Sequence, residues 1–532
     1  MALRYRLLVV VLLSIAAVAA GASPCSRAIG PTEVRSQLMA LDLLIRGGQV
    51  LDGSGASAVS ADIGIRDDRI VFVGDAAKAR LTAVRTVDAS GLIVAPGFID
   101  PHTHTLEDLS DSKRKSNENY LMQGVTTVIT GNDGGGPLQI AKTLDQWSKL
   151  GIGTNGALLV GHGSARREVM GMSDAEPTQE QLARMKALIR QAMDEGAFGM
   201  STGLYYAPGS YARTEEVIEL ARIVADKGGI YDSHMRDESS YSIGLLGSIE
   251  ETIRIGREAK IPVNISHIKA LGADVWGKSK DAIEMIRKAR TAGIKVTADQ
   301  YPYTASGSSV TASLVPRWAE AGGNAELLKR IDDPAVRSRL IKEMEANLGR
   351  RGGPESLLIT SARNRALIGK TLAALASEWK MPPVEAALEI IKGGGASVAS
   401  FNMNESDIAN FMTQEWVMTG SDGSGGHPRK YGTFPRKLRE YVYKKKLISL
   451  PFAVQHSSAL VAETFRIPDR GLLRVGYFAD VIVFDEKTIA DRATYREPEL
   501  LATGVKYVIV NGKVVVEEGG FNGTYAGRAL RK

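Results

Sequence analysis

Apolar and polar positions follow a repeating order in the middle of the chain. Short apolar runs alternate with longer stretches in which apolar residues recur every three or four positions, as Met185, Ile189 and Ala192 do within residues 181–195. The short runs are typical of buried strands and the longer stretches of amphipathic helices. Eight such strands can be identified, at residues 97–100, 127–130, 157–160, 197–200, 229–232, 263–266, 296–299 and 416–419. Eight strand–helix units predict an α/β fold, a closed (β/α)8 TIM-like barrel over residues 95–464.

Both ends of the chain show a different pattern, in which strand-like runs are separated by tight turns. Residues 42–94 contain apolar runs punctuated by Gly-Gly, Asp-Gly and Asp-Asp turns, and residues 465–525 contain runs at 479–484, 505–510 and 513–516. The last two runs are joined by Asn-Gly at 511–512, a strong hairpin signal. We therefore expect residues 42–94 and 465–525 to form one small β-sandwich domain beside the barrel.

Residues 316–414, between the seventh and eighth strands, are far more than one crossover connection needs. Helical patterns cover residues 324–348 and 371–392. Because the loops that follow barrel strands lie over the functional end of such barrels, the pattern predicts a helical insertion that covers the barrel mouth. A separate interaction domain is the alternative.

The first 22 residues are typical of a signal peptide. Arg4 and Arg6 precede an apolar run at residues 7–20, and small residues follow. We expect an exported protein, periplasmic or secreted. The run is too short for a convincing membrane span, so none is predicted in the mature chain. Cys25 is the only cysteine, which excludes an intrachain disulfide, and Pro24 directly before it makes a lipid-anchored cysteine a weak alternative.

Composition narrows the classes of function. With 532 residues and 44% hydrophobic content, the chain can bury a large core. Its 66 basic and 60 acidic residues give a net charge of +6 without any long run of one sign, so nucleic acid is not an expected partner. There are only seven histidines, and four of them stand at the ends of predicted barrel strands: His102, His104, His234 and His267. So few histidines, concentrated at strand ends, favour a role as metal ligands over a role as ordinary surface residues.

Polar residues at the ends of these strands are placed to converge on a metal ion. His102 and His104 leave a strand end on the same side, because side chains alternate with period two. His234 and His267 end successive strands, and Asp422 ends the eighth strand, which lies beside the first in a closed barrel. Imidazoles and carboxylates suit zinc. The alternatives are two surface histidines in the His-x-His motif and a turn-forming Asp-Gly at Asp422.

Longer motifs connect these residues to a known family. They are Ala-Pro-Gly-Phe-Ile-Asp-Pro-His-Thr-His at 95–104, Gly-Val-Thr-Thr-Val at 124–128, Ser-Thr-Gly-Leu-Tyr-Tyr at 201–206, Ser-His-Ile-Lys at 266–269, Asp-Gln-Tyr-Pro-Tyr at 299–303, His-Pro-Arg at 427–429 and Gly-Thr-Phe-Pro-Arg at 432–436. The first marks the amidohydrolase superfamily, and the later ones resemble the N-acyl-D-amino-acid deacylases, or D-aminoacylases. The resemblance runs from about residue 42 to residue 532 and implies the same barrel and flanking β domain.

The resemblance also implies a zinc centre, with one ion bound tightly and a second, weaker site left open. Its ligands would come from His102, His104, His234, His267 and Asp422. One position departs from the family, because Gly-Asn-Asp-Gly at 131–134 stands where these deacylases usually carry a metal-binding cysteine. Our hypothesis is that Asp133 takes that position as a harder oxygen ligand, which leaves other divalent metals open. The alternative is an aspartate that caps a glycine-rich turn.

The family's reaction supplies the remaining expectations. It is hydrolysis of the amide bond of N-acyl-D-amino acids, small-molecule substrates that yield a carboxylic acid and a D-amino acid. A metal-bound hydroxide would attack, and Asp422 would act as general base and then as general acid. By resemblance, Lys269, Tyr301 and Arg429 would bind the substrate's carboxylate, while Tyr205 would line the acyl pocket or pack its rim. A related amidohydrolase that acts on a dipeptide or cyclic amide, and a non-enzymatic metal-binding protein on the same scaffold, are the alternatives.

Overall fold

A barrel of eight parallel strands forms the centre of the computed structural model, which describes residues 40–532. The barrel closes where Thr103 pairs in parallel with Gly423 and where the Asp422 N–H donates to the His102 carbonyl at 2.9 Å. All eight predicted strands are confirmed. The signal peptide predicted at residues 1–22, and Cys25, lie outside the described residues. In sheet order the strands are β6 (Phe98–Thr103), β7 (Val125–Thr130), β8 (Asn155–Gly161), β9 (Gly199–Gly203), β10 (Ile230–His234), β11 (Val263–Ile265), β12 (Val296–Gln300) and β16 (Val417–Thr419).

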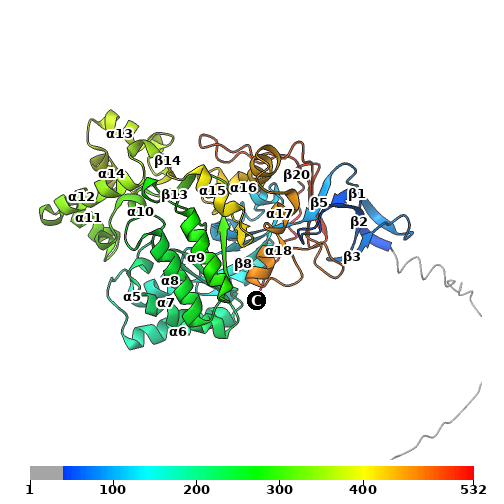
Figure 1. Cartoon of the computed structure of the whole chain (residues 1–532), viewed down its shortest axis with the longest axis horizontal. Coiled ribbons are helices and arrows are strands. Elements are labelled where there is room, and N and C mark those ends of the chain that lie inside the picture. The colour runs from blue at the N-terminus through cyan, green and yellow to red at the C-terminus, as the bar shows by residue number, and fades with distance from the viewer. Residues whose placement is uncertain (1–39) are drawn as a thin grey trace, which may run out of the picture. The chain divides into compact units, whose positions relative to one another are not determined.

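Helices follow the barrel strands, and α7, α8 and α9 pack side by side (Figure 1). The apolar stripe predicted at residues 181–195 lies in α6, which buries Met185, Ile189 and Ala192. Thr178 begins this helix in a capping box, because it exchanges side-chain hydrogen bonds with the backbone and side chain of Gln181. The helices are α2 (Leu106–Ser110), α3 (Glu118–Leu121), α4 (Ile140–Leu150), α5 (His162–Met170), α6 (Gln179–Asp194), α7 (Thr214–Asp226), α8 (Gly244–Ala259), α9 (Ser279–Thr291), α15 (Glu405–Met412), α16 (Arg429–Arg436), α17 (Leu450–Gln455) and α18 (Ala459–Phe465). Within residues 40–532, none of the helices has both the length and the apolar composition needed to cross a bilayer.

Strands from both ends of the described chain share one nine-stranded sheet. In it β5 (Ile93–Pro96) lies between β1 (Ala40–Val50), its parallel neighbour, and β17 (Val481–Phe484), its antiparallel neighbour. Alternate residues such as Leu43, Ile63 and Val481 are buried in a cluster distinct from the barrel core. The prediction that strands from the two ends build one flanking β domain is therefore confirmed. The remaining strands are β2 (Val59–Arg66), β3 (Arg69–Gly74), β4 (Thr82–Asp88), β18 (Val505–Val510), β19 (Lys513–Glu517) and β20 (Gly520–Phe521).

The segment between β12 and β16 holds an insertion with a hydrophobic core of its own. Each helical stretch predicted there is divided in two, the first at Asp333-Pro334 and the second at Lys380, whose φ of 54° is left-handed. Proline suits the first turn of a helix because its missing N–H would have no partner there. An antiparallel sheet in the order β13, β15, β14 is an addition that the predicted helical insertion did not include. The elements are β13 (Ala305–Ser309), α10 (Val310–Leu314), α11 (Asn324–Asp332), α12 (Pro334–Arg350), β14 (Leu357–Ala362), α13 (Leu372–Trp379), α14 (Pro383–Lys392) and β15 (Ala396–Phe401).

A buried lysine contacts the barrel's last strand. Lys437 follows α16, is only 2% exposed and donates to the Thr419 hydroxyl at 2.7 Å. No carboxylate within residues 40–532 forms an ion pair with it, and burial lowers the pKa of Lys437 to about 7. His456 is buried nearby, where burial and the charge of Lys437 lower its pKa to about 4. Both groups are therefore easier to protonate in the unfolded chain.

We expect the stability of the protein to rise with pH because of these two groups. The unfolded state binds more protons between about pH 4 and 6.5 at His456, and between about pH 7 and 10.5 at Lys437. A Lys437→Met variant should lose the rise above pH 7, a difference on the order of a few kcal/mol, which thermal unfolding from pH 7 to 10 would report. The exposed Lys513→Met is the matched control. A constant difference between wild type and Lys437→Met over this pH range would contradict the assignment.

Candidate metal centre

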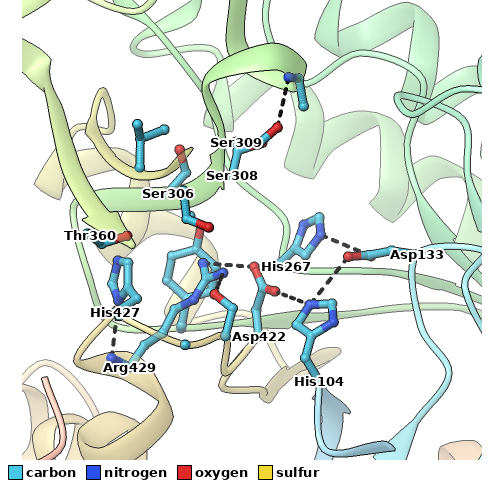
Figure 2. A pocket seen from close by; sticks show the side chains of 18 of the residues that line it. His104, Asp133, His267, Ser306, Ser308, Ser309, Thr360, Asp422, His427 and Arg429 are labelled. Carbon is cyan, nitrogen blue, oxygen red and sulfur yellow. Dashed lines mark hydrogen bonds and ion pairs between the residues drawn. The ribbon is translucent and has the colours of Figure 1, made fainter. Parts of the chain in front are cut away.

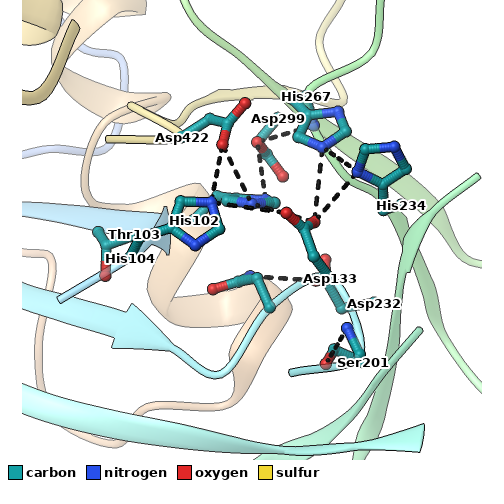
Figure 3. Close-up of polar contacts among 12 residues, drawn as sticks. His102, Thr103, His104, Asp133, Ser201, Asp232, His234, His267, Asp299 and Asp422 are labelled. Atoms are coloured by element: carbon teal, nitrogen blue, oxygen red, sulfur yellow. Dashed lines mark hydrogen bonds and ion pairs between the residues drawn. The ribbon is translucent and has the colours of Figure 1, made fainter. Parts of the chain in front are cut away.

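The carboxyl ends of five barrel strands bring the six predicted metal ligands together (Figure 3). Parallel strands end at the same rim, so residues far apart in sequence meet there. The ligand candidates at this rim are His102, His104, Asp133, His234, His267 and Asp422. Three of them have a left-handed backbone, with φ of 56° at Asp133, 37° at His267 and 48° at Asp422. Such a backbone is uncommon away from glycine and is found preferentially where function constrains the chain.

The Asp133 carboxylate lies at the centre of this group. Its Oδ1 is 3.4 Å from His102 Nε2, 3.3 Å from His234 Nδ1 and 3.5 Å from His267 Nε2. Its Oδ2 is 3.5 Å from His104 Nε2. Burial opposes ionisation, but the charges of His102 and His234 hold the pKa of Asp133 well below its ordinary value. One anionic oxygen pair is thus surrounded by four imidazoles.

These donors fit a divalent cation. His102 is fully buried, yet neither of its ring nitrogens has a hydrogen-bond partner among the described residues. One ligand atom from each of His102, Asp133, His267 and Asp422 lies within 4.8 Å of the others, and His234, Glu238 and His267 form a second such group. Imidazole nitrogens combined with carboxylate oxygens are the set that zinc and similar ions take in proteins.

Buried carboxylates and amides behind the candidate ligands hold them in place. Asp299 Oδ1 accepts from the His267 N–H at 3.0 Å, and the Asn264 amide bridges Asp299 and Asp232 at 2.8 Å each. Burial raises the pKa of Asp232 to about 6 and that of Asp100 to about 7. Sequence reasoning missed these supporting residues, although the sequence carried a signal for two of them. Asp100 and Asp232 each precede a candidate histidine by two positions on the same strand, hence on the same face.

Asp422 lies between the imidazoles and a buried arginine (Figure 2). Its Oδ1 is 3.0 Å from His104 Nε2, and its Oδ2 is 2.8 Å from Arg429 Nη1. Burial raises the pKa of Asp422, but the charges of Arg429 and His267 outweigh it and hold the pKa below the ordinary range. Arg429 also donates to the Ser424 hydroxyl at 3.2 Å and lies over the Tyr301 ring. Asp422 is therefore an ionised carboxylate, as a proton acceptor must be.

Lys269 is paired with a glutamate that sequence reasoning missed. Its Nζ is 2.6 Å from both Glu238 Oε1 and His267 Nδ1. Glu238 Oε1 in turn is 3.0 Å from His267 Nδ1, so a carboxylate orients the ring whose Nε2 faces Asp133. Glu238 follows β10 in a loop, four residues after His234, and no strand pattern marks it.

A cavity of about 690 Å³ opens onto the candidate metal centre. All four residues predicted to bind substrate line it, namely Lys269, Tyr301, Arg429 and Tyr205. The Tyr205 hydroxyl donates to the Ala312 carbonyl at 2.7 Å, so its proton is already used. The insertion supplies much of the remaining wall, including Ser306, Arg351 and Thr360. The insertion therefore borders the cavity in which a substrate would lie.

Several known proteins resemble this chain over most of its length. The chain is 35% identical to a D-aminoacylase from Alcaligenes xylosoxydans xylosoxydans over 94% of its own length and 99% of that protein's. It is 34% identical to an N-acyl-D-glutamate deacylase from the same organism, over 89% and 93% of the two chains. A solved N-acyl-D-glutamate deacylase from Bordetella bronchiseptica, complexed with zinc and a phosphonate inhibitor, matches with a TM-score of 0.79 at 31% identity, over 93% of this chain and all of that one.

A crystal structure of a D-aminoacylase also superposes with a TM-score of 0.79, at 34% identity over 92% of this chain and all of that one. The family model described as the amidohydrolase family matches residues 85–516. Because the family model covers most of the chain and these relatives match it over nearly all of their own length, the chain belongs to the amidohydrolase family, in the branch of the D-aminoacylases and N-acyl-D-amino-acid deacylases.

Proposed function

We propose that this protein is a metal-dependent deacylase that hydrolyses the amide bond of N-acyl-D-amino acids, releasing a carboxylic acid and a D-amino acid. The observation that carries the proposal is the convergence of four imidazoles on Asp133, with Asp422 and two cations directly beside them. The D configuration is taken from the names of the relatives, because the residues themselves do not specify handedness.

Zinc is the proposed metal. Asp133, His234 and His267 would hold the tightly bound ion, and His102, His104 and Asp422 would contribute to a second, weaker site. The zinc named for the Bordetella relative supports this assignment. Because Asp133 is a harder ligand than the cysteine expected from the family, we propose a preference shifted away from the softest ions. A bound divalent ion polarises the amide carbonyl and lowers the pKa of water from 15.7 toward about 7.

Asp422 is the proton carrier in the proposed reaction. Its ionised carboxylate accepts a proton from the attacking water and returns it to the amide nitrogen, so that the amine leaves neutral. His104 and Arg429 hold the two carboxylate oxygens from opposite sides, which fixes the orientation of the side chain.

Arg429, Lys269 and Tyr301 form the proposed site for the substrate's α-carboxylate. Both cations lie next to the candidate ligands, and both line the cavity. Arg429 presents a planar fork of donors suited to a carboxylate, and Nη1 already contacts Asp422. A bound α-carboxylate would therefore share the guanidinium with Asp422, which couples substrate binding to the charge on the proton carrier.

A substrate panel tests the proposed function. With zinc-loaded protein we expect hydrolysis of N-acetyl-D-amino acids at a kcat/KM at least about 100 times that for the L enantiomers, which present the amide in the wrong orientation. Simple dipeptides and cyclic amides should react still more slowly. Amino-acid release measured with a chiral assay would report all of these rates. A preference for dipeptides, cyclic amides or L substrates would overturn the proposal.

Removal of metal provides an independent check. Dialysis against a chelator should abolish hydrolysis, and added zinc should restore it, with metal content followed by elemental analysis. Chelation should also lower the midpoint of thermal unfolding, because an ion that binds only the folded state stabilises it. Full activity in a sample shown to be free of divalent metal would contradict the proposed site.

A further inference from the structure

Arg351 is a buried cation on the wall of the cavity. It directly follows α12 of the insertion, is only 2% exposed and lines the same cavity as the candidate metal ligands. An arginine side chain stays protonated at any physiological pH, so a full positive charge is buried here. No carboxylate within residues 40–532 forms an ion pair with it, and its Nε has no hydrogen-bond partner.

Within the part of the chain that the structure describes, the polar partners of the Arg351 side chain are all neutral. Nη2 donates to the Tyr205 hydroxyl at 3.0 Å, and Nη1 lies 3.4 Å from the Ser306 hydroxyl. The Asn402 amide oxygen is 3.2 Å from Nη1 when that amide is turned to satisfy its neighbours. The guanidinium also lies near the face of Tyr241, 5.6 Å from the ring centroid. These contacts orient the side chain without compensating its charge.

The other two cations of the cavity differ from Arg351 in this respect. Lys269 is paired with Glu238 and Arg429 with Asp422. A buried charge is costly unless a counter-charge or strong hydrogen bonds replace water. An unpaired guanidinium on the wall of a cavity is therefore placed to receive an anion from outside the protein, and a planar carboxylate is the anion it binds in two-point fashion.

The location of Arg351 separates it from the proposed α-carboxylate site. Lys269 and Arg429 contact His267 and Asp422 directly, whereas Arg351 contacts Tyr205, whose ring stacks on His234 with centroids 5.8 Å apart. One aromatic residue thus lies between Arg351 and the candidate metal centre. A group bound by Arg351 must be carried on an arm that extends away from the scissile amide.

We propose that Arg351 binds a second carboxylate of the substrate, in addition to the α-carboxylate. This inference rests on the proposed function and defines its substrate class as N-acyl-D-amino acids with two negative charges. The second carboxylate is carried either on the amino-acid side chain or on the distal end of the acyl group. Both present the same chemistry to the guanidinium.

Matched substrate pairs test the inference on the wild-type protein. N-acetyl-D-glutamate is compared with N-acetyl-D-glutamine, and N-succinyl-D-leucine with N-butyryl-D-leucine. We expect the acidic member of one pair to exceed its neutral partner at least about tenfold in kcat/KM. The pair that shows this preference tells whether the second carboxylate lies on the amino-acid side chain or on the acyl group. If neither acidic member is preferred, the inference is wrong even though neutral substrates are hydrolysed. If no N-acyl-D-amino acid is hydrolysed, the proposed function fails and the inference fails with it.

Substitutions locate the preference at Arg351. Arg351→Met should lower kcat/KM for the preferred acidic substrate about 100-fold and for its neutral partner less than about threefold. Arg351→Lys should retain part of the preference. The neighbouring Arg350→Met removes the same charge outside this cavity and should change neither rate. An equal loss on both members of the pair would show that Arg351 supports the fold and not the substrate.

A binding measurement on the wild type does not depend on how the variants fold. Titration calorimetry of the zinc-loaded protein should show tighter binding of the acidic product of the responsive pair, D-glutamate or succinate, than of its neutral counterpart, D-glutamine or butyrate. Equal affinity for the charged and neutral products would overturn the inference.

Discussion

An Asp422→Asn variant should keep its metal and lose at least about 1,000-fold in kcat, near the upper end of what one proton-transferring group contributes. Asparagine has nearly the same shape, and its amide oxygen can still accept from Arg429, whose Nη1 is 2.8 Å from Asp422 Oδ2 in the native protein. An amide cannot take a proton from water at neutral pH, so the shuttle to the amide nitrogen stops. Steady-state kinetics and metal analysis on the same sample measure the two effects.

The matched control for this substitution is Asp281→Asn, which makes the same chemical change on the exposed surface of α9 and should leave kcat unchanged. Substrate affinity should change little in Asp422→Asn if its effect lies in proton transfer. Wild-type turnover in the asparagine variant would remove Asp422 from the mechanism.

Replacing Asp133 should also lower activity strongly, because the protein would lose its metal. We expect Asp133→Asn to bind zinc at least about 100-fold more weakly, because even changes in residues behind a ligand cost 10- to 100-fold in affinity. Asparagine tolerates the left-handed backbone at this position, where φ is 56°, so loss of metal in this variant would follow from loss of the anionic ligand and not from backbone strain. Competition with a chromogenic chelator would measure the affinity.

A cysteine at the same position provides the complementary test. Asp133→Cys should bind zinc and should raise the affinity for softer ions relative to wild type, because thiolate is the softer ligand. Asp111→Ala, a change at a half-exposed carboxylate that is not among the candidate ligands, is the control and should leave metal affinity unchanged. Full metal content and full activity in Asp133→Asn would leave this residue only the role of capping its turn.

The sequence predicted the barrel and the convergence of its polar residues for a physical reason. Parallel strands buried on both faces appear as uninterrupted apolar runs, and their carboxyl ends share one rim, so His102, His234 and Asp422 could be placed together from strand order alone. The structure brings all six predicted ligand positions to that rim. Their roles as ligands stay predictions until metal binding is measured.

The parts that could not be predicted depend on contacts between distant loops. Glu238 reaches His267 from a loop after β10, and Arg351 reaches Tyr205 from the end of an insertion helix. Neither contact is marked by a periodic pattern in the sequence. The sheet of the insertion was also not predicted, because β13 reads Ala-Ser-Gly-Ser-Ser, without the alternation of apolar and polar residues that marks a half-buried strand. The pairing of Arg429 with Asp422 likewise depends on the turn that joins them.

The insertion packs around its own hydrophobic cluster, yet it contributes residues to the cavity beside the barrel rim. The groups proposed to break the amide bond thus lie on the barrel, whereas part of the wall that would recognise the substrate lies on a segment with its own hydrophobic core. Substitutions in the insertion can change which substrate fits while the barrel residues stay the same. A protein engineer could therefore graft a different insertion onto the same barrel to obtain hydrolysis of other amides.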